Sequence, residues 1–260
     1  MNILERLANS ARKRVSSAKT SVSLEKLKEQ ACALEKGGLD FEKALKKPNL
    51  SFICECKKAS PSKGLISKDF PYLKIAKDYE EAGANAVSVL TEPTEFLGSG
   101  EYLEKISANI NLPCLRKDFI VDEYMIYEAK ILGAKAYLLI AALLSESELK
   151  NFIAIGNSLG MSALVETRNK EEIKKSLSAG AKIIGVNNRN LKDFSVDMKK
   201  TAELRDLVPK NILFVAESGI NTADDVKIMQ EVGADAVLIG EALMKAEDKS
   251  AKLKELRSKL

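Results

Sequence analysis

The sequence is of the α/β class and predicts a single (β/α)8 barrel over residues 1–260. Three observations support this prediction: a recurring Gly-Ala pair, eight short apolar segments, and helix-start signals between those segments. Within this one domain, we expect residues 1–47 to form an N-terminal helical extension and residues 48–260 to form the barrel.

The Gly-Ala pair recurs at regular intervals. It begins at Gly83, Gly133, Gly180 and Gly233, and an apolar segment follows each time. A glycine suits the left-handed conformation just past a helix end. The chain between successive glycines is long enough for two strand–helix units of about 25 to 30 residues each.

Eight apolar segments are the candidate strands. They are residues 52–57, 86–91, 113–117, 136–141, 163–166, 183–187, 213–217 and 236–239. Most are nearly continuous hydrophobic runs, which is typical of strands covered on both faces. Strands that alternate with helices form parallel sheets, and eight such units in a chain of this length predict a TIM barrel. A doubly wound open sheet is the alternative, but no G-x-G-x-x-G motif follows the first strand to favour it.

Polar and acidic residues mark helix starts between these strands. The Ser-Lys-Asp run at 67–69 opens a predicted helix that extends to residue 81, and Ser145 opens one that extends to residue 158. Residues 122–123 and 221–224 mark the starts of two more helices. Side chains of this kind cap the free N–H groups of a first helical turn, and early acidic residues favour its dipole.

Ahead of the first strand, apolar residues at helical spacing predict two extra helices that pack on the barrel. These residues are Leu4, Leu7, Ala8 and Ala11 in the first helix and Leu24, Leu27 and Ala31 in the second. Gly37-Gly38 and Pro48 break the chain between these helices and the barrel.

Composition narrows the class of protein. The chain is 45% hydrophobic and 30% charged, which is ordinary for a soluble globular protein. No apolar run reaches about 18 residues, so we expect no membrane span, and the first residues lack the basic-then-apolar order of a signal peptide. The cysteines form no C-x-x-C pair, and we expect reduced thiols in a cytoplasmic protein. They are Cys32, Cys54, Cys56 and Cys114.

Charge and residue types limit the chemistry. The net charge of +4 is modest, the lysines are spread along the chain, and there is no Trp. A nucleic-acid partner is therefore unsupported, and a small anionic ligand fits better. The chain has no histidine, which removes the Ser-His-Asp and Cys-His triads, the histidine proton shuttle and most zinc sites. We expect no metal, no cofactor, no membrane partner, and a monomer or weak homo-oligomer.

Glu55 and Lys57 carry the strongest local signal for function. They lie at the carboxyl end of an apolar strand, and residues two apart in a strand share a face. Cys54 and Cys56 therefore point the other way. An acid and a base on one face are costly to keep out of water, so this pair is either a structural ion pair or part of a site.

Polar residues gather at the predicted carboxyl ends of the strands, where barrels of this class place their active sites. The set consists of Glu55, Lys57, Arg116, Lys117, Asp118, Glu166, Asn187, Asn188, Arg189, Glu217, Ser218, Gly219, Gly240 and Glu241. One such residue can be a rim salt bridge. Ionisable groups at the same end of five strands favour a catalytic site.

Two glycine turns predict a phosphate site. Ser218-Gly219 follows the seventh strand and Gly240-Glu241 follows the eighth, and each turn leads into a helix. Glycine lets backbone N–H groups approach an anion, and the loops after these two strands are the usual phosphate cradle of the fold. Lys57 or Ser60 can lean in from the first strand because the barrel closes on itself.

In several segments the sequence resembles the indole-3-glycerol phosphate synthase family. The matching segments are Glu55-x-Lys57-x-x-Ser60-Pro61-Ser62-x-Gly64, Arg116-Lys117-Asp118-Phe119-Ile120-Val121, Leu164-Val165-Glu166, residues 184–191 (IGVNNRNL), Ala216-Glu217-Ser218-Gly219-Ile220 and residues 238–244 (LIGEALM). They run in family order from about residue 50 to 245, and residues 4–12 are similar to the family's helical extension.

This resemblance implies a carboxy-lyase of tryptophan biosynthesis that converts 1-(2-carboxyphenylamino)-1-deoxyribulose 5-phosphate to indole-3-glycerol phosphate, CO2 and water. It implies Lys117 as general acid and Glu166 as base, with Glu55 and Lys57 assisting dehydration. The implied substrate-binding residues are Ser60, Phe96, Phe119, Asn187, Arg189, Leu191 and Glu217. The implied phosphate-binding residues are Lys57, Ser218, Gly219, Gly240 and Glu241.

Two other functions stay open at this point. A sugar-phosphate isomerase of the same fold needs a base–acid pair but no cationic acid on the third strand, so Lys117→Ala discriminates the two enzymes. A phosphate-ligand binding protein without turnover is the other alternative. The four charges at one rim (Glu55, Lys57, Lys117 and Glu166) argue against it.

Overall fold

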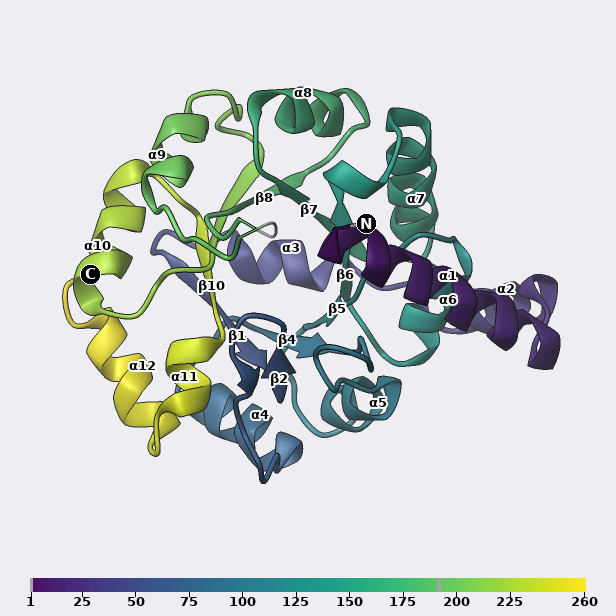
Figure 1. Cartoon of the computed structure of the whole chain (residues 1–260), viewed down its shortest axis with the longest axis horizontal. Coiled ribbons are helices and arrows are strands. Elements are labelled where there is room, and N and C mark those ends of the chain that lie inside the picture. The colour runs from purple at the N-terminus through teal and green to yellow at the C-terminus, as the bar shows by residue number, and fades with distance from the viewer. Residues whose placement is uncertain (1, 191–192) are drawn as a thin grey trace.

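Eight parallel strands form a closed barrel in the computed structural model, which describes residues 2–190 and 193–260 (Figure 1). The strands are β1 (Ser51–Cys56), β4 (Ala86–Leu90), β5 (Cys114–Lys117), β6 (Ala136–Ile140), β7 (Ser162–Thr167), β8 (Ile183–Asn187), β9 (Leu213–Glu217) and β10 (Ala236–Ile239). They pair in chain order, and β10 returns to β1, with Ser51 opposite Ala236. The predicted barrel is confirmed, and every predicted strand boundary lies within one residue of the observed one.

Helices surround the strands as an outer ring (Figure 1). They are α4 (Tyr72–Glu81), α5 (Gly100–Ser107), α6 (Tyr124–Ile131), α7 (Glu146–Ser158), α8 (Lys170–Ser178), α9 (Lys199–Arg205), α10 (Ala223–Val232), α11 (Glu241–Lys245) and α12 (Lys249–Arg257). A short 3-10 helix, Ala141–Leu143, follows β6, and a small antiparallel pair, β2 (Ala59–Ser60) with β3 (Gly64–Leu65), follows β1.

The local signals in the sequence explain most helix boundaries. Ser145 and Thr222 cap α7 and α10 with a reciprocal capping box. The four glycines of the Gly-Ala pairs all have the left-handed backbone predicted for them. The predicted start of α4 at 67–69 is wrong, because Pro71 disfavours a helical conformation at the residue before it and the helix begins at Tyr72.

The N-terminal extension contains three helices rather than the predicted two. They are α1 (Ile3–Ser21), α2 (Leu24–Ala33) and α3 (Asp40–Leu45). The sequence analysis missed α3, which has six residues between the Gly37-Gly38 break and Pro48. Its Phe41 and Leu45 are fully buried, and Ser51 at the start of β1 donates a hydrogen bond to the Leu45 carbonyl. The helix therefore covers the amino end of the barrel.

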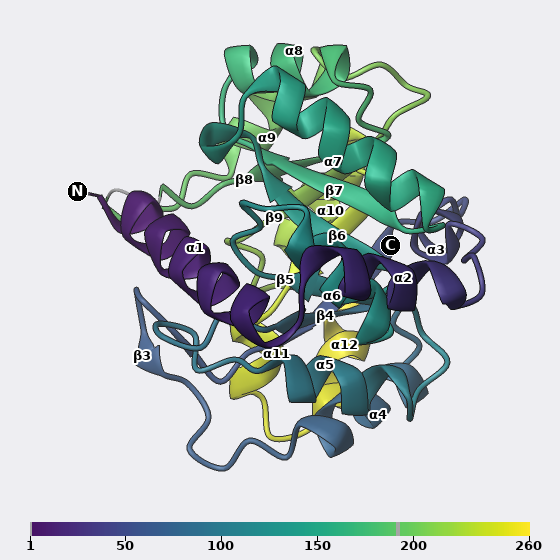
Figure 2. The ribbon, with the colours of Figure 1, turned by 90° about the vertical axis from the view of Figure 1, so that its right-hand side faces the viewer.

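Helix α1 lies at the opposite, carboxyl end of the barrel from α3 (Figure 2). Ion pairs hold it to loops that follow β4 and β5. These pairs are Arg6–Glu95 at 2.5 Å, Arg14–Asp118 at 2.7 Å and Lys19–Asp122 at 2.8 Å. The extension therefore adds a wall at the end of the barrel where the sequence predicts the site.

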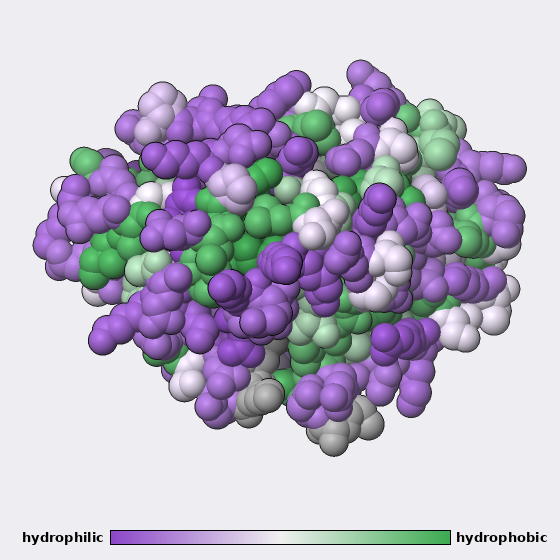
Figure 3. All heavy atoms as spheres, turned by 90° about the horizontal axis from the view of Figure 1, so that it is seen from above, coloured by the Kyte–Doolittle hydropathy of each residue, from purple (hydrophilic) through white to green (hydrophobic). Residues whose placement is uncertain are grey.

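The outer surface seen from above is mainly hydrophilic, with hydrophobic residues showing between the polar ones (Figure 3). Among the helices of the described residues, none is both long enough and apolar enough to cross a membrane.

Candidate active site

A cavity of about 540 Å³ opens at the carboxyl ends of the strands. This volume is in the range of small-molecule sites. Its lining includes all of the catalytic, substrate-binding and phosphate-binding residues that the family resemblance implies except Leu191, which lies outside the described residues. The polar part of the wall comes from β1, β5, β7, β8 and β9 and from the turns after β9 and β10.

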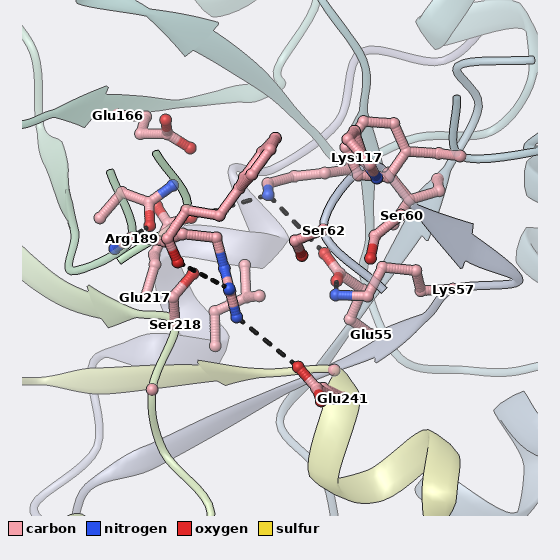
Figure 4. Close-up of a pocket in the computed structure, with 18 of the residues that line it drawn as sticks. Glu55, Lys57, Ser60, Ser62, Lys117, Glu166, Arg189, Glu217, Ser218 and Glu241 are labelled. Carbon is pink, nitrogen blue, oxygen red and sulfur yellow. Dashed lines mark hydrogen bonds and ion pairs between the residues drawn. The ribbon is translucent and has the colours of Figure 1, made fainter. Parts of the chain in front are cut away.

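The ammonium group of Lys117 lies between two carboxylates (Figure 4). Its Nζ is 3.7 Å from Glu55 Oε2 and 3.7 Å from Glu217 Oε2. Burial lowers the pKa of Lys117, but the carboxylates of Glu55, Glu217 and Glu166 together raise it above the ordinary lysine value. Lys117 is therefore a protonated cation directed into the cavity.

Glu55 joins Lys117 to a second lysine. Lys57 Nζ donates to Glu55 Oε1 at 2.7 Å, and the Ser88 hydroxyl donates to Glu55 Oε2 at 3.3 Å. Burial raises the pKa of Glu55, but Lys57 and Lys117 outweigh it and hold that pKa below its usual range. Cys54 and Cys56 point away and are buried between strands and helices, as their alternation with Glu55 predicts.

Glu217 is a buried carboxylate with one charged partner among the described residues, Lys117. Its side chain is 2% exposed, and neither oxygen has a hydrogen-bonding partner among residues 2–190 and 193–260. Burial, with help from Glu166 and Glu55 and against the attraction of Lys117, raises the pKa of Glu217 to about 8. Gly185 on β8 makes room for it, since a Cβ there would lie 2.1 Å from Glu217 Oε1.

Glu166 stands on β7, on the other side of the cavity from Lys57 (Figure 4). It is 3% exposed and contributes to the raised pKa of Lys117. The cavity thus has one carboxylate pair close to Lys117 and a third carboxylate across the open space.

The turns after β9 and β10 form the predicted anion-binding end. Ser218 and Gly219 both have left-handed backbone, with φ of 67° and 88°. At Gly240 a Cβ would lie 2.6 Å from Glu55 Oε1 and 2.9 Å from Lys57 Nζ, so a larger residue there would displace the ends of these two side chains. Lys57 therefore contacts both Glu55 and the Gly240 turn.

Glu241 forms ion pairs with three cationic side chains at the mouth of the cavity. Its carboxylate is 2.7 Å from Lys245 Nζ and 3.5 Å from Lys63 Nζ. It is 3.6 Å from Arg189 Nη2 (Figure 4). Arg189 also donates to the Phe194 carbonyl at 3.3 Å. These contacts join the loops after β1 and β8 to helix α11.

The remaining wall is apolar. Phe96 and Phe119 lie with ring centroids 6.2 Å apart. The sequence analysis missed most other apolar lining residues, and the helical spacing of Leu4 and Leu7 predicted a helix but not its position over the cavity. The missed residues are Ile3, Leu4, Leu7, Leu90, Leu138, Ile140, Phe194, Val196, Met198, Ile220, Leu238 and Ile239.

Three of the polar strand-end residues do not direct their functional groups into the cavity, which corrects the prediction that all of them converge. Arg116 donates to the Met125 carbonyl at 2.8 Å and pairs with Glu128 at 2.6 Å. Asp118 touches the cavity rim, but its carboxylate is bound by Arg14 and Thr91. Residues on either side of Lys117 face the other way because side chains alternate along a strand.

Asn188 also has a supporting position. It accepts from the Thr201 hydroxyl at 2.7 Å and donates to the Ser218 carbonyl at 3.1 Å. It therefore holds the left-handed turn at Ser218 in place. No group of three or more His, Cys, Asp or Glu side chains in the described part of the chain is arranged to hold a metal ion.

Comparison with known proteins decides the family. The family model of indole-3-glycerol phosphate synthase matches residues 4–256. The chain belongs to this family. A relative of that name from Ruminiclostridium cellulolyticum is 53% identical over 98% of both chains. One from Endomicrobium trichonymphae is 50% identical over 98% of this chain and 99% of its own length.

Solved structures with little sequence similarity share the fold. The 3-hexulose-6-phosphate synthase from Salmonella typhimurium has a TM-score of 0.67 at 13% identity, over 80% of this chain and 97% of that one. Thiamine phosphate pyrophosphorylase from Pyrococcus furiosus has a TM-score of 0.60 at 17% identity, over 84% of this chain and 96% of that one. At these identities the likeness concerns the barrel alone.

Proposed function

We propose that the cavity at the carboxyl end of the barrel carries out the reaction of the family. As an indole-3-glycerol phosphate synthase, the chain is a carboxy-lyase of tryptophan biosynthesis. The substrate is 1-(2-carboxyphenylamino)-1-deoxyribulose 5-phosphate. Ring closure, loss of CO2 and loss of water give indole-3-glycerol phosphate.

The observation that supports this proposal most is the position of Lys117. In ring closure an aryl carbon attacks the ketone, and negative charge develops on the carbonyl oxygen. A fixed cationic acid at that oxygen stabilises the charge and supplies the proton. Lys117 is largely shielded, with its side chain 16% exposed; it is held between Glu55 and Glu217 and has a raised pKa, so it is protonated before the substrate binds.

The later steps need a second acid and a base. After CO2 departs, the aromatic ring is restored, a hydroxyl leaves as water, and a proton is removed from a neighbouring atom. Glu166, across the cavity from Lys57, is our proposed base. The hydrogen-bonded pair of Lys57 and Glu55 is proposed to protonate the departing hydroxyl.

The rest of the wall is proposed to hold the substrate. The phosphate lies between the turns at Ser218-Gly219 and Gly240-Glu241, within reach of Lys57 and Ser60. Asn187, Arg189 and Glu217 hold the hydroxyls and the carboxylate. Phe96 and Phe119 enclose the aryl ring, and Leu191 remains a sequence prediction for the same slot.

The test uses the purified protein and the carboxyphenylamino-deoxyribulose phosphate with no added cofactor. Indole fluorescence and CO2 release are followed together, and both should rise in equal molar amounts. If the folded protein produces neither, or isomerises the substrate without releasing CO2, the proposal is wrong. Recovery of unchanged, bound substrate would instead support a binding protein.

We also propose that the enzyme works in the cytoplasm as a monomer or weak homo-oligomer. The free thiols of Cys54, Cys56 and Cys114 on the barrel support a reducing compartment. Analytical ultracentrifugation over a range of concentrations tests the oligomeric state, and a concentration-independent larger species would contradict it.

A further inference from the structure

A buried carboxylate outside the proposed mechanism organises the loop between β4 and α5. Glu92 lies two residues past the end of β4 and is 0% exposed. Its Oε1 accepts from the backbone N–H of Thr94 at 2.9 Å and from the Thr94 hydroxyl. Its Oε2 accepts from the N–H groups of Glu95 at 2.7 Å and Phe96 at 3.0 Å. One carboxylate therefore binds three successive backbone N–H groups.

Other contacts close the same loop. The Glu92 carbonyl accepts from the Gly98 N–H at 2.8 Å. A Cβ at Gly98 would lie 2.4 Å from the Leu90 carbonyl oxygen, so the loop packs directly on the end of β4. Glu95 in turn pairs with Arg6 of α1. The loop is thus fixed from inside by Glu92 and from outside by α1.

This loop presents one side chain to the cavity. Phe96 lines it, and its ring faces that of Phe119 at 6.2 Å with an angle of 41° between the planes. A buried carboxylate is costly unless hydrogen bonds compensate it, and Glu92 obtains that compensation from the backbone that carries Phe96. The last of its three N–H donors belongs to Phe96 itself.

We propose that Glu92 is a positioning residue for the aryl ring of the substrate. By holding the backbone of Phe96, it sets the separation of Phe96 and Phe119 before the substrate arrives, so that binding does not have to order the loop. This inference rests on the proposed function, because it needs a substrate with an aryl ring. It goes further by giving a role to a residue that touches neither the substrate nor the reacting groups.

The Glu92→Gln substitution removes the charge and turns one acceptor into an NH2 donor that faces backbone N–H groups. The loop should lose its fixed conformation and Phe96 its position, while the phosphate turns and Lys117 stay in place. We therefore expect weaker binding of ligands that contain the aryl ring and unchanged binding of ligands that lack it.

Two probes separate these effects. The first is the substrate with its ketone reduced to an alcohol, which keeps the carboxyphenyl group and cannot react. The second is ribulose 5-phosphate, which has the phosphate and hydroxyls without the ring. For Glu92→Gln we expect about a tenfold higher Kd for the first probe, equivalent to about 1.4 kcal/mol, and a Kd for the second within about twofold of wild type. In turnover, KM should rise with kcat nearly unchanged.

A double-mutant cycle with Phe96→Ala tests whether Glu92 acts through Phe96. In the Phe96→Ala background, Glu92→Gln should have no further effect on the aryl probe. Thr94→Val, which removes only the hydroxyl donor to Glu92, is the matched control and should change the Kd by less than about threefold. If Glu92→Gln does not fold, Glu92→Asp, whose shorter side chain cannot reach all three N–H groups, carries the same comparison.

Three results would overturn the proposal: an unchanged Kd for the aryl probe, an equal loss for both probes, or additive effects of Glu92→Gln and Phe96→Ala. Failure of the proposed function gives a different result. In that case the wild-type protein itself would bind the aryl probe no better than ribulose 5-phosphate.

Discussion

The end of β5 separates two groups of charges that differ in how completely they are paired. The inner cluster, Glu55, Lys57, Lys117 and Glu217, faces the cavity. The outer cluster, Arg14, Arg116, Asp118 and Glu128 together with the hydroxyl of Thr91, lies between β5 and helices α1 and α6. Both are anchored on one short strand, since Lys117 points inward and its neighbours Arg116 and Asp118 point outward.

The central carboxylates of the two clusters, Asp118 and Glu217, are equally buried, but their pKa values are shifted in opposite directions. Asp118 accepts hydrogen bonds from Arg14, Thr91 and the Phe119 N–H, and the arginines outweigh burial and hold its pKa below its usual range. Glu217 has no hydrogen-bonding partner in the described ranges, and burial raises its pKa to about 8. In the outer cluster every carboxylate oxygen of Asp118 accepts a hydrogen bond, whereas in the inner cluster Glu217 has, among the described residues, only the ion pair with Lys117 and keeps its oxygens available for a ligand.

The largest effect should come from removing the cation of the inner cluster. Lys117→Ala should lower kcat for indole-3-glycerol phosphate formation by about 10²–10⁴-fold, because the general acid is lost. The free energy of unfolding should change by no more than about 1 kcal/mol, since Glu55 keeps Lys57, and Glu217, whose pKa is already raised to about 8, can stay protonated and neutral. Steady-state kinetics and urea denaturation measure the two quantities. Lys74→Ala on the exposed face of α4 is the control, and near-wild-type turnover by Lys117→Ala would refute the assigned role.

The outer cluster should show the reverse pattern. Asp118→Ala removes the carboxylate that binds Arg14 and leaves the buried Arg116 with Glu128 alone, and we expect the free energy of unfolding to fall by about 3 kcal/mol. The kcat of the folded protein should drop less than about tenfold. Lys19→Ala breaks the partly exposed ion pair with Asp122, and Lys19 lies on α1, the helix that also carries Arg14. It should lower the free energy of unfolding by no more than about 1 kcal/mol. If Asp118→Ala and Lys19→Ala lower the free energy of unfolding equally, the prediction that the buried pair contributes more than the exposed one is wrong.

The raised pKa of Glu217 predicts a pH dependence of stability. Its pKa is about 8 in the folded chain against an ordinary value of 4.5, so the folded state binds the proton more tightly. This contribution to stability is fully present below the ordinary value and is lost as the pH rises through 8, by up to about 1.4 kcal/mol per pH unit. Glutamine has no proton to exchange in this range, so the stability of Glu217→Gln lacks this dependence on pH. Urea denaturation of both proteins from pH 5 to 8.5 should therefore show wild-type stability falling relative to the variant, and parallel curves would contradict the prediction.

The smallest effect should come from Glu241 at the mouth of the cavity. Glu241→Gln removes a negative charge beside the proposed phosphate turn and releases Lys63 and Arg189 from it. Inorganic phosphate should then inhibit more strongly, by roughly fivefold, which corresponds to about 1 kcal/mol at a solvated site. Inhibition constants at low and high salt measure this, and the difference should shrink with added salt. Weaker inhibition in the variant would show that the carboxylate positions the cations instead of competing with the anion.

The strands of the barrel could be predicted because a strand that is buried on both faces is a short, nearly continuous apolar run. Helix starts could be predicted where a capping side chain was present, as at Ser145. Two features were missed for physical reasons. Residues 67–69 have the composition of a cap, but Pro71 sets the actual start of α4. Helix α3 is too short to show a period, and tertiary contacts of Phe41 and Leu45 hold it.

The sequence predicted which residues form the site, but it did not predict the direction in which each side chain points. Motif residues such as Lys117 and Gly240 line the cavity, because the ends of parallel strands meet at one end of a barrel. The outward direction of Arg116 and Asp118 follows from strand alternation once Lys117 is known to point inward. The contribution of Leu4 and Leu7 to the wall depends on how α1 docks, and no local pattern contains that information.

The pairing of β1 with β10 has a consequence for the nascent chain. Glu55 and Lys57 are made early, and the Gly240 turn that lies against them follows about 180 residues later. At about 5–20 residues per second, ribosomes need on the order of 10–40 s for that interval. Until then the sheet has two open edges, which invite association with other unfinished chains. The site therefore cannot be complete before β10 has left the ribosome and paired with β1, and shorter chains lack one side of it.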